Sequence, residues 1–138
     1  MRVLLADDQT KVRSALRLLL EQEPGMNVVG EAAENDDLLA QVEATQPDLV
    51  LLDWELPDQG GAATLAGLRA ARPGLVVIAL SGQPEARQAA LDAGADAFVS
   101  KGDPPERLLA AVDDCWRKRH CCATGGTGAS QAVSQRSA

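Results

Sequence analysis

The sequence contains no long apolar run. Its longest uninterrupted apolar stretch, Leu75 to Leu80, is six residues long, whereas a transmembrane helix needs roughly 20. At the amino end only the apolar run 3–6 precedes Asp7, which is too short for the apolar core of a signal peptide. We therefore expect a cytoplasmic protein that does not contact the membrane.

Positive charge and cysteine are also scarce. Thirteen Lys and Arg stand against twenty Asp and Glu, which gives a formal net charge of −7. Because sequence-independent binding to a phosphate backbone needs clustered basic residues, we expect no direct binding of nucleic acid. The cysteines, Cys115, Cys121 and Cys122, are odd in number and lack the paired spacing of zinc sites. We expect free thiols.

What the sequence does contain is an alternation of short apolar runs and amphipathic segments, within a length of 138 residues that fits one domain. This pattern is typical of strands and helices that alternate around a buried parallel sheet. The predicted strands are 3–6, 28–29, 49–52, 75–80 and 97–100, and the predicted helices are 12–20, 36–45, 62–72, 84–93 and 104–119. We expect 28–29 at an edge of the sheet and the wholly apolar 49–52 at its centre.

The composition changes from Cys121 onward to Gly, Ser, Thr, Ala and Gln. Such a segment has little to pack against a core. We predict one domain over 1–120 and a flexible tail, or a linker cut short, over 121–138.

Polar groups follow four of the predicted strands. Asp7 and Asp8 follow the first, Asp53 the third, Ser81 the fourth and Lys101 the fifth. In an open parallel sheet these carboxyl ends form the ligand site. Crowded carboxylates repel one another, so a positive group must lie among them, either Lys101 or a hard divalent cation such as Mg2+. A carboxylate, an ammonium and a hydroxyl around a metal-bound phosphoryl group are the parts needed for phosphoryl transfer.

Four short motifs carry a family resemblance. They are the acidic pair Asp7–Asp8, the loop Asp53-Trp-Glu-Leu-Pro57, the step Ser81–Gly82 and the segment 94–101, Gly-Ala-Asp-Ala-Phe-Val-Ser-Lys. In this order and spacing, over residues 2–119, the chain resembles the receiver domain of two-component response regulators. Segments 28–33 and 94–105 are most similar to receivers that precede a helix-turn-helix output domain. The resemblance implies a flavodoxin-like α/β fold, (βα)5, whose doubly wound, five-stranded parallel sheet has the order 2-1-3-4-5.

The resemblance also implies a signalling function. Asp53 would accept phosphate from a histidine kinase, a phosphotransfer protein or a small phosphodonor, while Ser81 and Lys101 bind the phosphoryl oxygens. Ser81 and the aromatic Phe98 would then act as a switch that changes a protein-interaction surface. That surface, on the fourth helix, fifth strand and fifth helix, is also the implied face of a homodimer. Beyond self-catalysed phosphotransfer and autodephosphorylation, no enzymatic activity is implied.

A magnesium site is implied by the same resemblance. Mg2+ would be held by Asp8, Asp53 and the backbone carbonyl of Glu55, with Asp7 assisting.

The chain departs from the usual family pattern at a few positions. Leu56 replaces a frequent Met with a side chain of similar volume. Gly102 follows Lys101 where many members have Pro, so the cis-proline of those members is missing. Glu55 and Gln83 occupy positions that tune the lifetime of the phosphoryl group in the family.

Other interpretations of these residues stay open at the level of sequence. Asp7–Asp8 could cap the first helix, Ser81 could only begin a turn, and Phe98 could be a core residue. The alternative functions are a receiver-like binding module that is not regulated by phosphorylation, and a phosphatase with an aspartate nucleophile. A nucleotide-binding flavodoxin or a P-loop protein is disfavoured because no glycine-rich loop follows the first strand. Because neighbouring side chains of a strand alternate, we expect Trp54 to point away from the site and Trp116 to lie far from it.

Overall fold

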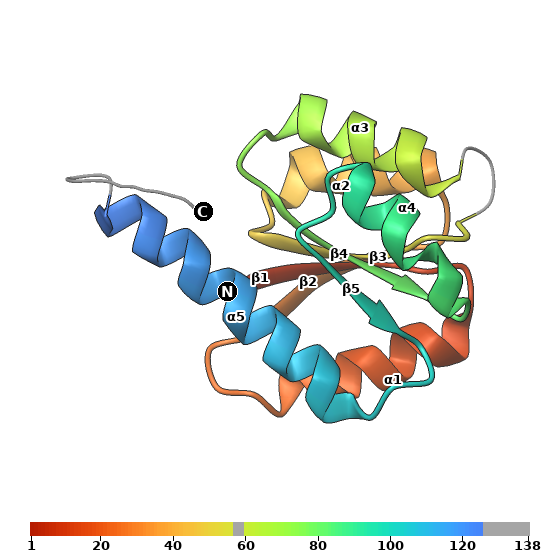
Figure 1. Ribbon diagram of the computed structural model, residues 1–138, viewed down its shortest axis with the longest axis horizontal. Helices are drawn as coiled ribbons and strands as arrows, with labels where there is room; N and C mark the ends of the chain where they lie inside the picture. The colour runs from red at the N-terminus through yellow and green to blue at the C-terminus, as the bar shows by residue number, and fades with distance from the viewer. Residues whose placement is uncertain (57–59, 126–138) are drawn as a thin grey trace.

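Five parallel strands form one sheet between two layers of helices in the computed structural model, which describes residues 1–56 and 60–125 (Figure 1). The strands are β1 (Arg2–Ala6), β2 (Asn27–Ala32), β3 (Leu49–Asp53), β4 (Val76–Ser81) and β5 (Ala97–Ser100). The helices are α1 (Thr10–Glu21), α2 (Asn35–Thr45), α3 (Gly61–Ala71), α4 (Arg87–Asp92) and α5 (Pro105–Gly125), and a 3-10 turn, η1 (Pro84–Ala86), leads into α4.

The strands lie in the order β2-β1-β3-β4-β5, and every neighbouring pair is parallel. This arrangement confirms the predicted order 2-1-3-4-5. Every residue of β3 is buried, which confirms its central place in the sheet. β2 lies at an edge, as predicted.

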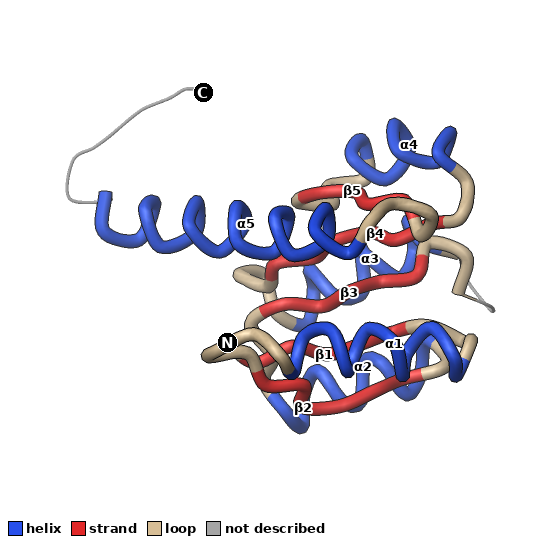
Figure 2. The backbone as a smooth tube through the Cα atoms, turned by 90° about the horizontal axis from the view of Figure 1, so that it is seen from below, coloured by secondary structure: helices blue, strands red, loops and turns tan. Residues whose placement is uncertain are grey.

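The two faces of the sheet have separate cores. Helices α1 and α5 cover one face, and α2, α3 and α4 cover the other (Figures 1 and 2). Leu49 and Leu51 of β3 pack in the core under α1 and α5, whereas Val50 and Leu52 pack in the core under the other helices. The alternation follows from the period of a strand. Because both faces are covered, the carboxyl edge of the sheet is left as the place for polar groups.

β2 is longer than the sequence predicts. It spans six residues, most of them partly exposed, whereas only 28–29 were predicted. Val3 pairs with Val28 and Leu4 pairs with Gly30, so Val29 is an extra residue that forms a bulge. Backbone pairing with β1 defines this strand, and a half-exposed edge leaves no apolar run by which to find it.

The last two helices also differ from the prediction. A 3-10 turn, with Pro84 at its start, comes before α4, where a single helix over 84–93 was predicted. Helix α5 continues to Gly125 and projects beyond the sheet (Figure 2), so it enters the segment predicted as a tail. Helical backbone hydrogen bonds lie within the helix, and they need no core beneath it.

The remaining predictions for the carboxyl end concern parts that the structure does not describe. Residues 126–138 of the predicted tail lie outside the described residues, as do the side chains of Cys121 and Cys122. Cys115 is a free, buried thiol, as predicted, and burial raises its pKa to about 11. Within residues 1–56 and 60–125, every helix is too short or too polar to cross a membrane.

Candidate functional site

The sheet order brings the predicted site residues to one edge. β1, β3, β4 and β5 are consecutive neighbours. Asp7, Asp53, Ser81 and Lys101 therefore lie at adjoining carboxyl ends, although they are far apart in the sequence. The loop after β3 is described up to Leu56, and Pro57 of the predicted motif lies outside the described residues.

These strand ends share one local geometry, in which a side chain accepts the backbone N–H of the second residue after it. The bonds run from Gln9 N–H to Asp7 Oδ1 at 2.8 Å, from Glu55 N–H to Asp53 Oδ1 at 3.0 Å, from Gln83 N–H to Ser81 Oγ at 2.9 Å and from Gly102 N–H to Ser100 Oγ at 3.3 Å. Asp and Ser form such turns readily because their short side chains reach the backbone. Gly102 supplies an N–H that a proline lacks.

The alternative explanations for single residues can now be decided in part. The N-cap of α1 is Gln9, and no side chain caps that helix, so the capping explanation of Asp7–Asp8 is wrong. Ser81 does begin a turn, but it is also fully buried beside the acidic residues. Phe98 packs in the core under α4. Its part in a switch stays a prediction.

The site contains three carboxylates in close contact. One oxygen from each of Asp7, Asp8 and Asp53 lies within 4.8 Å of the other two. Asp7 and Asp53 are buried, while Asp8 is exposed, so the cluster opens to solvent on one side. An all-oxygen donor set with an open side fits a hard divalent cation that keeps some of its waters, as Mg2+ does.

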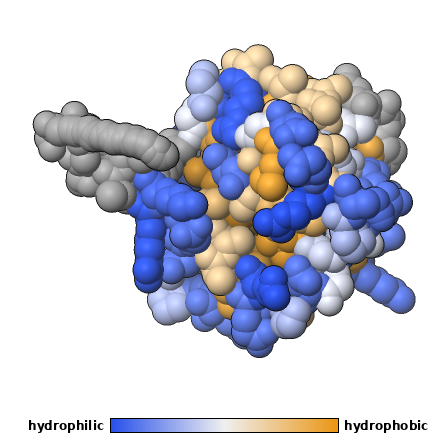
Figure 3. Space-filling view, viewed as in Figure 1, coloured by the Kyte–Doolittle hydropathy of each residue, from blue (hydrophilic) through white to orange (hydrophobic). Residues whose placement is uncertain are grey.

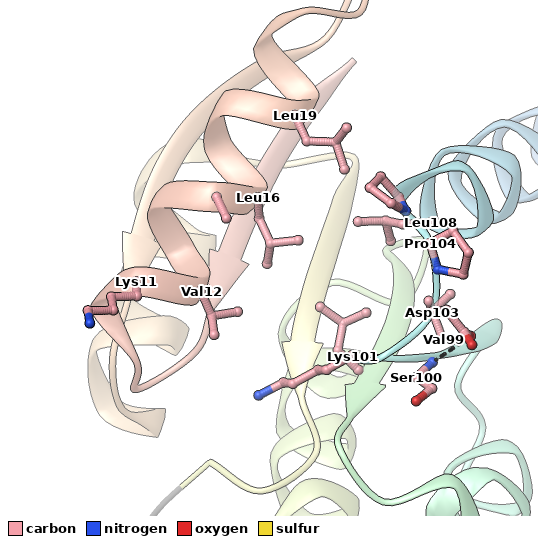
Figure 4. Close-up of a pocket in the computed structure, with 13 residues that line it drawn as sticks. Lys11, Val12, Leu16, Leu19, Val99, Ser100, Lys101, Asp103, Pro104 and Leu108 are labelled. Carbon is pink, nitrogen blue, oxygen red and sulfur yellow. Dashed lines mark hydrogen bonds between the residues drawn. The ribbon is translucent and has the colours of Figure 1, made fainter.

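Lys101 supplies positive charge to this cluster. Its Nζ lies 2.8 Å from Asp7 Oδ2 and 3.2 Å from Asp53 Oδ1. Apart from this ion pair, Asp7 Oδ2 accepts no hydrogen bond from the described residues. Figure 4 shows Lys101 extending from the end of β5 past an apolar groove between α1 and α5, a cavity of about 380 Å3. The Lys101 ammonium therefore approaches Asp7 and Asp53 from the apolar groove, whereas Asp8 lies on the solvent-exposed side of the acidic cluster.

Burial and charge shift the pKa values of the central pair. Burial raises the pKa of Asp53, an effect that the Glu55 N–H bond opposes and the charge of Asp7 reinforces. Burial alone would lower the pKa of Lys101, but its contacts with Asp7 and Asp53 outweigh this and raise it. Lys101 therefore stays protonated at neutral pH, and Asp53 is a more basic carboxylate than usual.

Two contacts at the site were not predicted from the sequence. Ser81 Oγ donates to Oε2 of Glu55 at 2.6 Å, although the sequence predicted for Glu55 a metal-binding backbone carbonyl and a position that tunes phosphoryl lifetime, and no contact with Ser81. Arg13 of α1 donates to the backbone carbonyl of Asp7 and, through Nε at 3.1 Å, to Glu31 of β2. Arg13 thereby ties the loop that carries the acidic pair to the edge strand. The Ser81–Glu55 and Arg13–Glu31 contacts have no signal in the sequence, because the pairing of β3 with β4 and of β1 with β2 brings their segments together.

Trp54 points away from the acids, as predicted. Its indole packs with the core under α2, α3 and α4, against Gly61. A Cβ at Gly61 would lie 2.2 Å from Cδ2 of the indole, so only glycine fits there without a shift. Trp116 lies at the other end of the sheet, beside Met1 and Met26.

Comparison with known proteins agrees with this arrangement. Residues 3–113 match the response regulator receiver domain family. The chain is 36% identical over 112 residues to the nitrate/nitrite response regulator protein NarL of Escherichia coli K12, an alignment that covers 80% of this chain and 52% of that protein. It is 43% identical over 103 residues to a protein-glutamate methylesterase/protein-glutamine glutaminase of Symbiobacterium thermophilum, covering 72% of this chain and 28% of that protein.

The similarity extends to solved structures. A LuxR-family two-component response regulator from Aurantimonas superposes with a TM-score of 0.80 at 30% identity, covering 86% of each chain. The signal receiver domain of a NarL-like regulator from Mycobacterium tuberculosis gives a TM-score of 0.76 at 31% identity, covering 84% of this chain and 95% of that chain.

The chain belongs to the response regulator receiver domain family, within two-component signalling. It spans about half the length of curated relatives such as NarL.

Proposed function

We propose that this chain is a phosphoacceptor module in which Asp53 takes a phosphoryl group from a histidine kinase, a phosphotransfer protein or a small phosphodonor. The observation that carries the proposal is the ion pair of Lys101 with Asp7 and Asp53 beside a cluster of three carboxylates. Such a cluster is costly to bury for structural reasons alone, since each close pair of like charges repels. Membership of the receiver family supports the same function.

In the proposed reaction an oxygen of the Asp53 carboxylate forms a bond to phosphorus, and the P–N bond of the phosphohistidine breaks. The electron pair of that bond leaves with the imidazole. Lys101 then binds a phosphoryl oxygen, because its charge is already held at the Asp53 carboxylate. The Ser81 hydroxyl would bind another. The reaction runs on Asp53 itself, as do autophosphorylation by small donors and autodephosphorylation, so the chain is not an enzyme that acts on other substrates.

Mg2+ is the cation that we propose for the acidic cluster. When bound, it supplies charge neutralisation to the transferring phosphoryl group. Asp8 and Asp53, with the backbone carbonyl of Glu55, would hold it, and Asp7 would assist while it keeps Lys101 in place. The phosphatase alternative is not favoured, since residues 3–113 match the receiver domain family.

We also propose that phosphorylation changes the face formed by α4, β5 and α5, and that two copies pair through it. Figure 3 shows hydrophobic surface between hydrophilic residues on the side where these elements lie. Phe98 of β5 packs in the same core as Ala86 and Ala90, so movement of the Ser81 loop would reach α4 through it. As in the family, we place the protein in the cytoplasm, with a histidine kinase as partner and with no direct contact with nucleic acid or membrane.

The phosphoacceptor is tested by incubating the chain with acetyl phosphate and Mg2+ and mapping the added mass to a peptide. We expect one phosphoryl group on Asp53 and none in the Asp53→Asn variant. Asp92→Asn, which removes an exposed carboxylate from α4, is the matched control and should be labelled like the parent. Undiminished labelling of Asp53→Asn contradicts the assignment.

The cation is tested separately by fluorescence of Trp54, which is part of the Asp53–Leu56 turn. A Trp116→Phe variant leaves Trp54 as the reporter, since the sequence has two tryptophans. Mg2+ should change its intensity in a saturable way, and the change should disappear when Asp8→Ala and Asp53→Asn are added. A response that survives both substitutions would place the cation elsewhere.

A further inference from the structure

The buried hydroxyl of Ser81 is fully engaged in this structure. Ser81 is 0% exposed. Its oxygen accepts the Gln83 N–H at 2.9 Å, and the hydroxyl donates to Oε2 of Glu55 at 2.6 Å, with the Gln83 carbonyl oxygen as a longer alternative acceptor at 3.3 Å. A serine hydroxyl has one proton to donate. While that proton is directed at Glu55, it is not directed at a phosphoryl oxygen on Asp53.

The strand register explains why these two side chains meet. Asp53 pairs with Leu80 in the β3–β4 ladder, and Trp54 N–H donates to the Leu80 carbonyl at 2.7 Å. The Asp53 turn then fixes the backbone of Glu55 through its N–H, at 3.0 Å. Glu55 therefore stands beside the first residue after Leu80, which is Ser81. The contact is built into the loop.

The Glu55 side chain forms a hydrogen bond to Ser81 on the side of the site and faces solvent on its other side. Glu55 is an exposed residue, and it forms no ion pair with the residues that the structure describes. A phosphoryl group on Asp53 would add negative charge near its carboxylate, and like charges at this range repel. Before the Ser81 hydroxyl can bind the phosphoryl group, its hydrogen bond to the Glu55 carboxylate must break, and the Glu55 side chain must rotate toward solvent.

We propose that the Glu55 side chain is an autoinhibitory contact, which holds the Ser81 hydroxyl away from the phosphoryl position until Asp53 is phosphorylated. This inference rests on the proposed function. It assigns to the side chain of Glu55 a role distinct from that of its backbone carbonyl. Hydrogen bonds to ionised acceptors are stronger than neutral ones. The interactions that phosphorylation adds must therefore offset the free energy of the Ser81–Glu55 bond.

The proposal predicts that loss of the Glu55 carboxylate favours the active conformation before phosphorylation. In Glu55→Ala we expect the ratio of active to inactive conformers, with Mg2+ alone, to rise roughly tenfold, as for loss of one charge-assisted hydrogen bond. The concentration of beryllofluoride, a phosphoryl mimic, that gives half conversion should fall by about the same factor. Glu55→Gln keeps an acceptor oxygen and removes the charge, so its shift should be smaller.

The measurement is the position of the Gly82 and Gln83 backbone amide signals in 15N-labelled full chain, with Mg2+ and increasing beryllofluoride. Glu85→Ala is the matched control, because it removes an exposed glutamate from the same loop region, and the hydrogen bonds described for the Ser81 hydroxyl involve Glu55 and Gln83, not Glu85. The Ser81→Ala variant separates an effect of Glu55 on the Ser81 hydroxyl from a general effect of its charge. When Glu55→Ala is added to Ser81→Ala, we expect no further shift. Thermal unfolding of each variant verifies that it is folded.

The outcomes separate this inference from the proposed function. If the parent chain neither responds to beryllofluoride nor takes up phosphate on Asp53, the proposed function is wrong, and the inference is overturned with it. If the parent responds but Glu55→Ala behaves like Glu85→Ala, only the inference is overturned. It is overturned in the same way if Glu55→Ala acts equally in the Ser81→Ala background. A shift specific to Glu55→Ala that needs Ser81 supports it.

Discussion

Replacing Lys101 with methionine tests the electrostatic arrangement of the site. The substitution keeps an unbranched apolar stem and removes the ammonium from Asp7 and Asp53. At an effective dielectric constant of about 20, the separations of 2.8 and 3.2 Å correspond to attractions of roughly 6 and 5 kcal/mol. Desolvation of the ammonium cancels much of this sum, and breaking a buried pair typically lowers stability by about 3–5 kcal/mol.

We expect a smaller loss than a fully buried pair would give. The Lys101 side chain is 21% exposed, and Asp53, whose pKa is already raised by burial, can bind a proton once the ammonium is gone. Lys101→Met should therefore lower the free energy of unfolding by about 2–3 kcal/mol in metal-free buffer at neutral pH, or roughly 10 °C in Tm.

The pH dependence of this loss has a definite sign. Because contacts with the acids raise the pKa of Lys101, its contribution is complete at neutral pH and is lost only as the pH rises through that raised value. Toward acid pH the contribution of Lys101 to the free energy of unfolding also shrinks, because protonated carboxyl groups carry no charge for the ammonium to attract. Added Mg2+ should reduce the loss as well, because it replaces the missing charge.

Urea unfolding followed by far-UV circular dichroism measures these differences. Lys118→Met is the matched control, since Lys118 pairs with Asp114 at a similar 3.2 Å but its side chain is 75% exposed. Exposed pairs contribute about 0.5 kcal/mol or less. Equal losses in the two variants, or a Lys101→Met loss that ignores pH and Mg2+, would refute the view that Lys101 neutralises the acidic cluster.

Two further substitutions test neighbouring features. Burial raises the pKa of Asp53, so ionisation of this carboxyl destabilises the fold as the pH rises above the ordinary carboxyl range. Asp53→Asn should therefore raise the Tm by a few °C at neutral pH without metal, and this gain should vanish at acid pH. Gly61→Ala places a Cβ 2.2 Å from the Trp54 indole, and should cost about 1–3 kcal/mol and alter Trp54 fluorescence. Gly67→Ala in the same helix, where the nearest atom is Leu39 Cδ2 at 3.6 Å, should be neutral or stabilising by up to about 1 kcal/mol.

The central part of this fold could be predicted because burial leaves a pattern in the sequence. β3 and β4 are buried on both faces, and both appear as unbroken apolar runs. β2 is half exposed, so its length depends on pairing with β1 and could not be read from hydrophobicity. The extension of α5 to Gly125 could not be predicted either, because the sequence from Cys121 onward has no apolar periodicity to mark a helix.

Only part of the site, like only part of the fold, could be predicted from the sequence. Asp53 and Lys101 were found because Asp53 ends β3 and Lys101 directly follows β5, and a parallel sheet brings the carboxyl ends of its strands together. The partner of a side chain is harder to predict. The Ser81–Glu55 bond joins residues 26 positions apart, and it exists because β3 and β4 pair with Asp53 opposite Leu80. A register shift of one residue would separate the two side chains and leave the sequence pattern unchanged.

The repulsion among the acids gives the site its sensitivity to ligands. Asp7 and Asp53 are buried together, and Lys101 offsets only part of the mutual repulsion with Asp8. A cation bound there gains the remaining attraction, and phosphorylation of Asp53 changes the charge that Lys101 must balance. The Lys101 backbone N–H donates to the Ser81 carbonyl at 2.8 Å, so a movement of Lys101 between Asp7 and Asp53 would act on the ends of both β4 and β5. Lys101 therefore contacts the acidic residues through its ammonium and the end of β4 through its backbone.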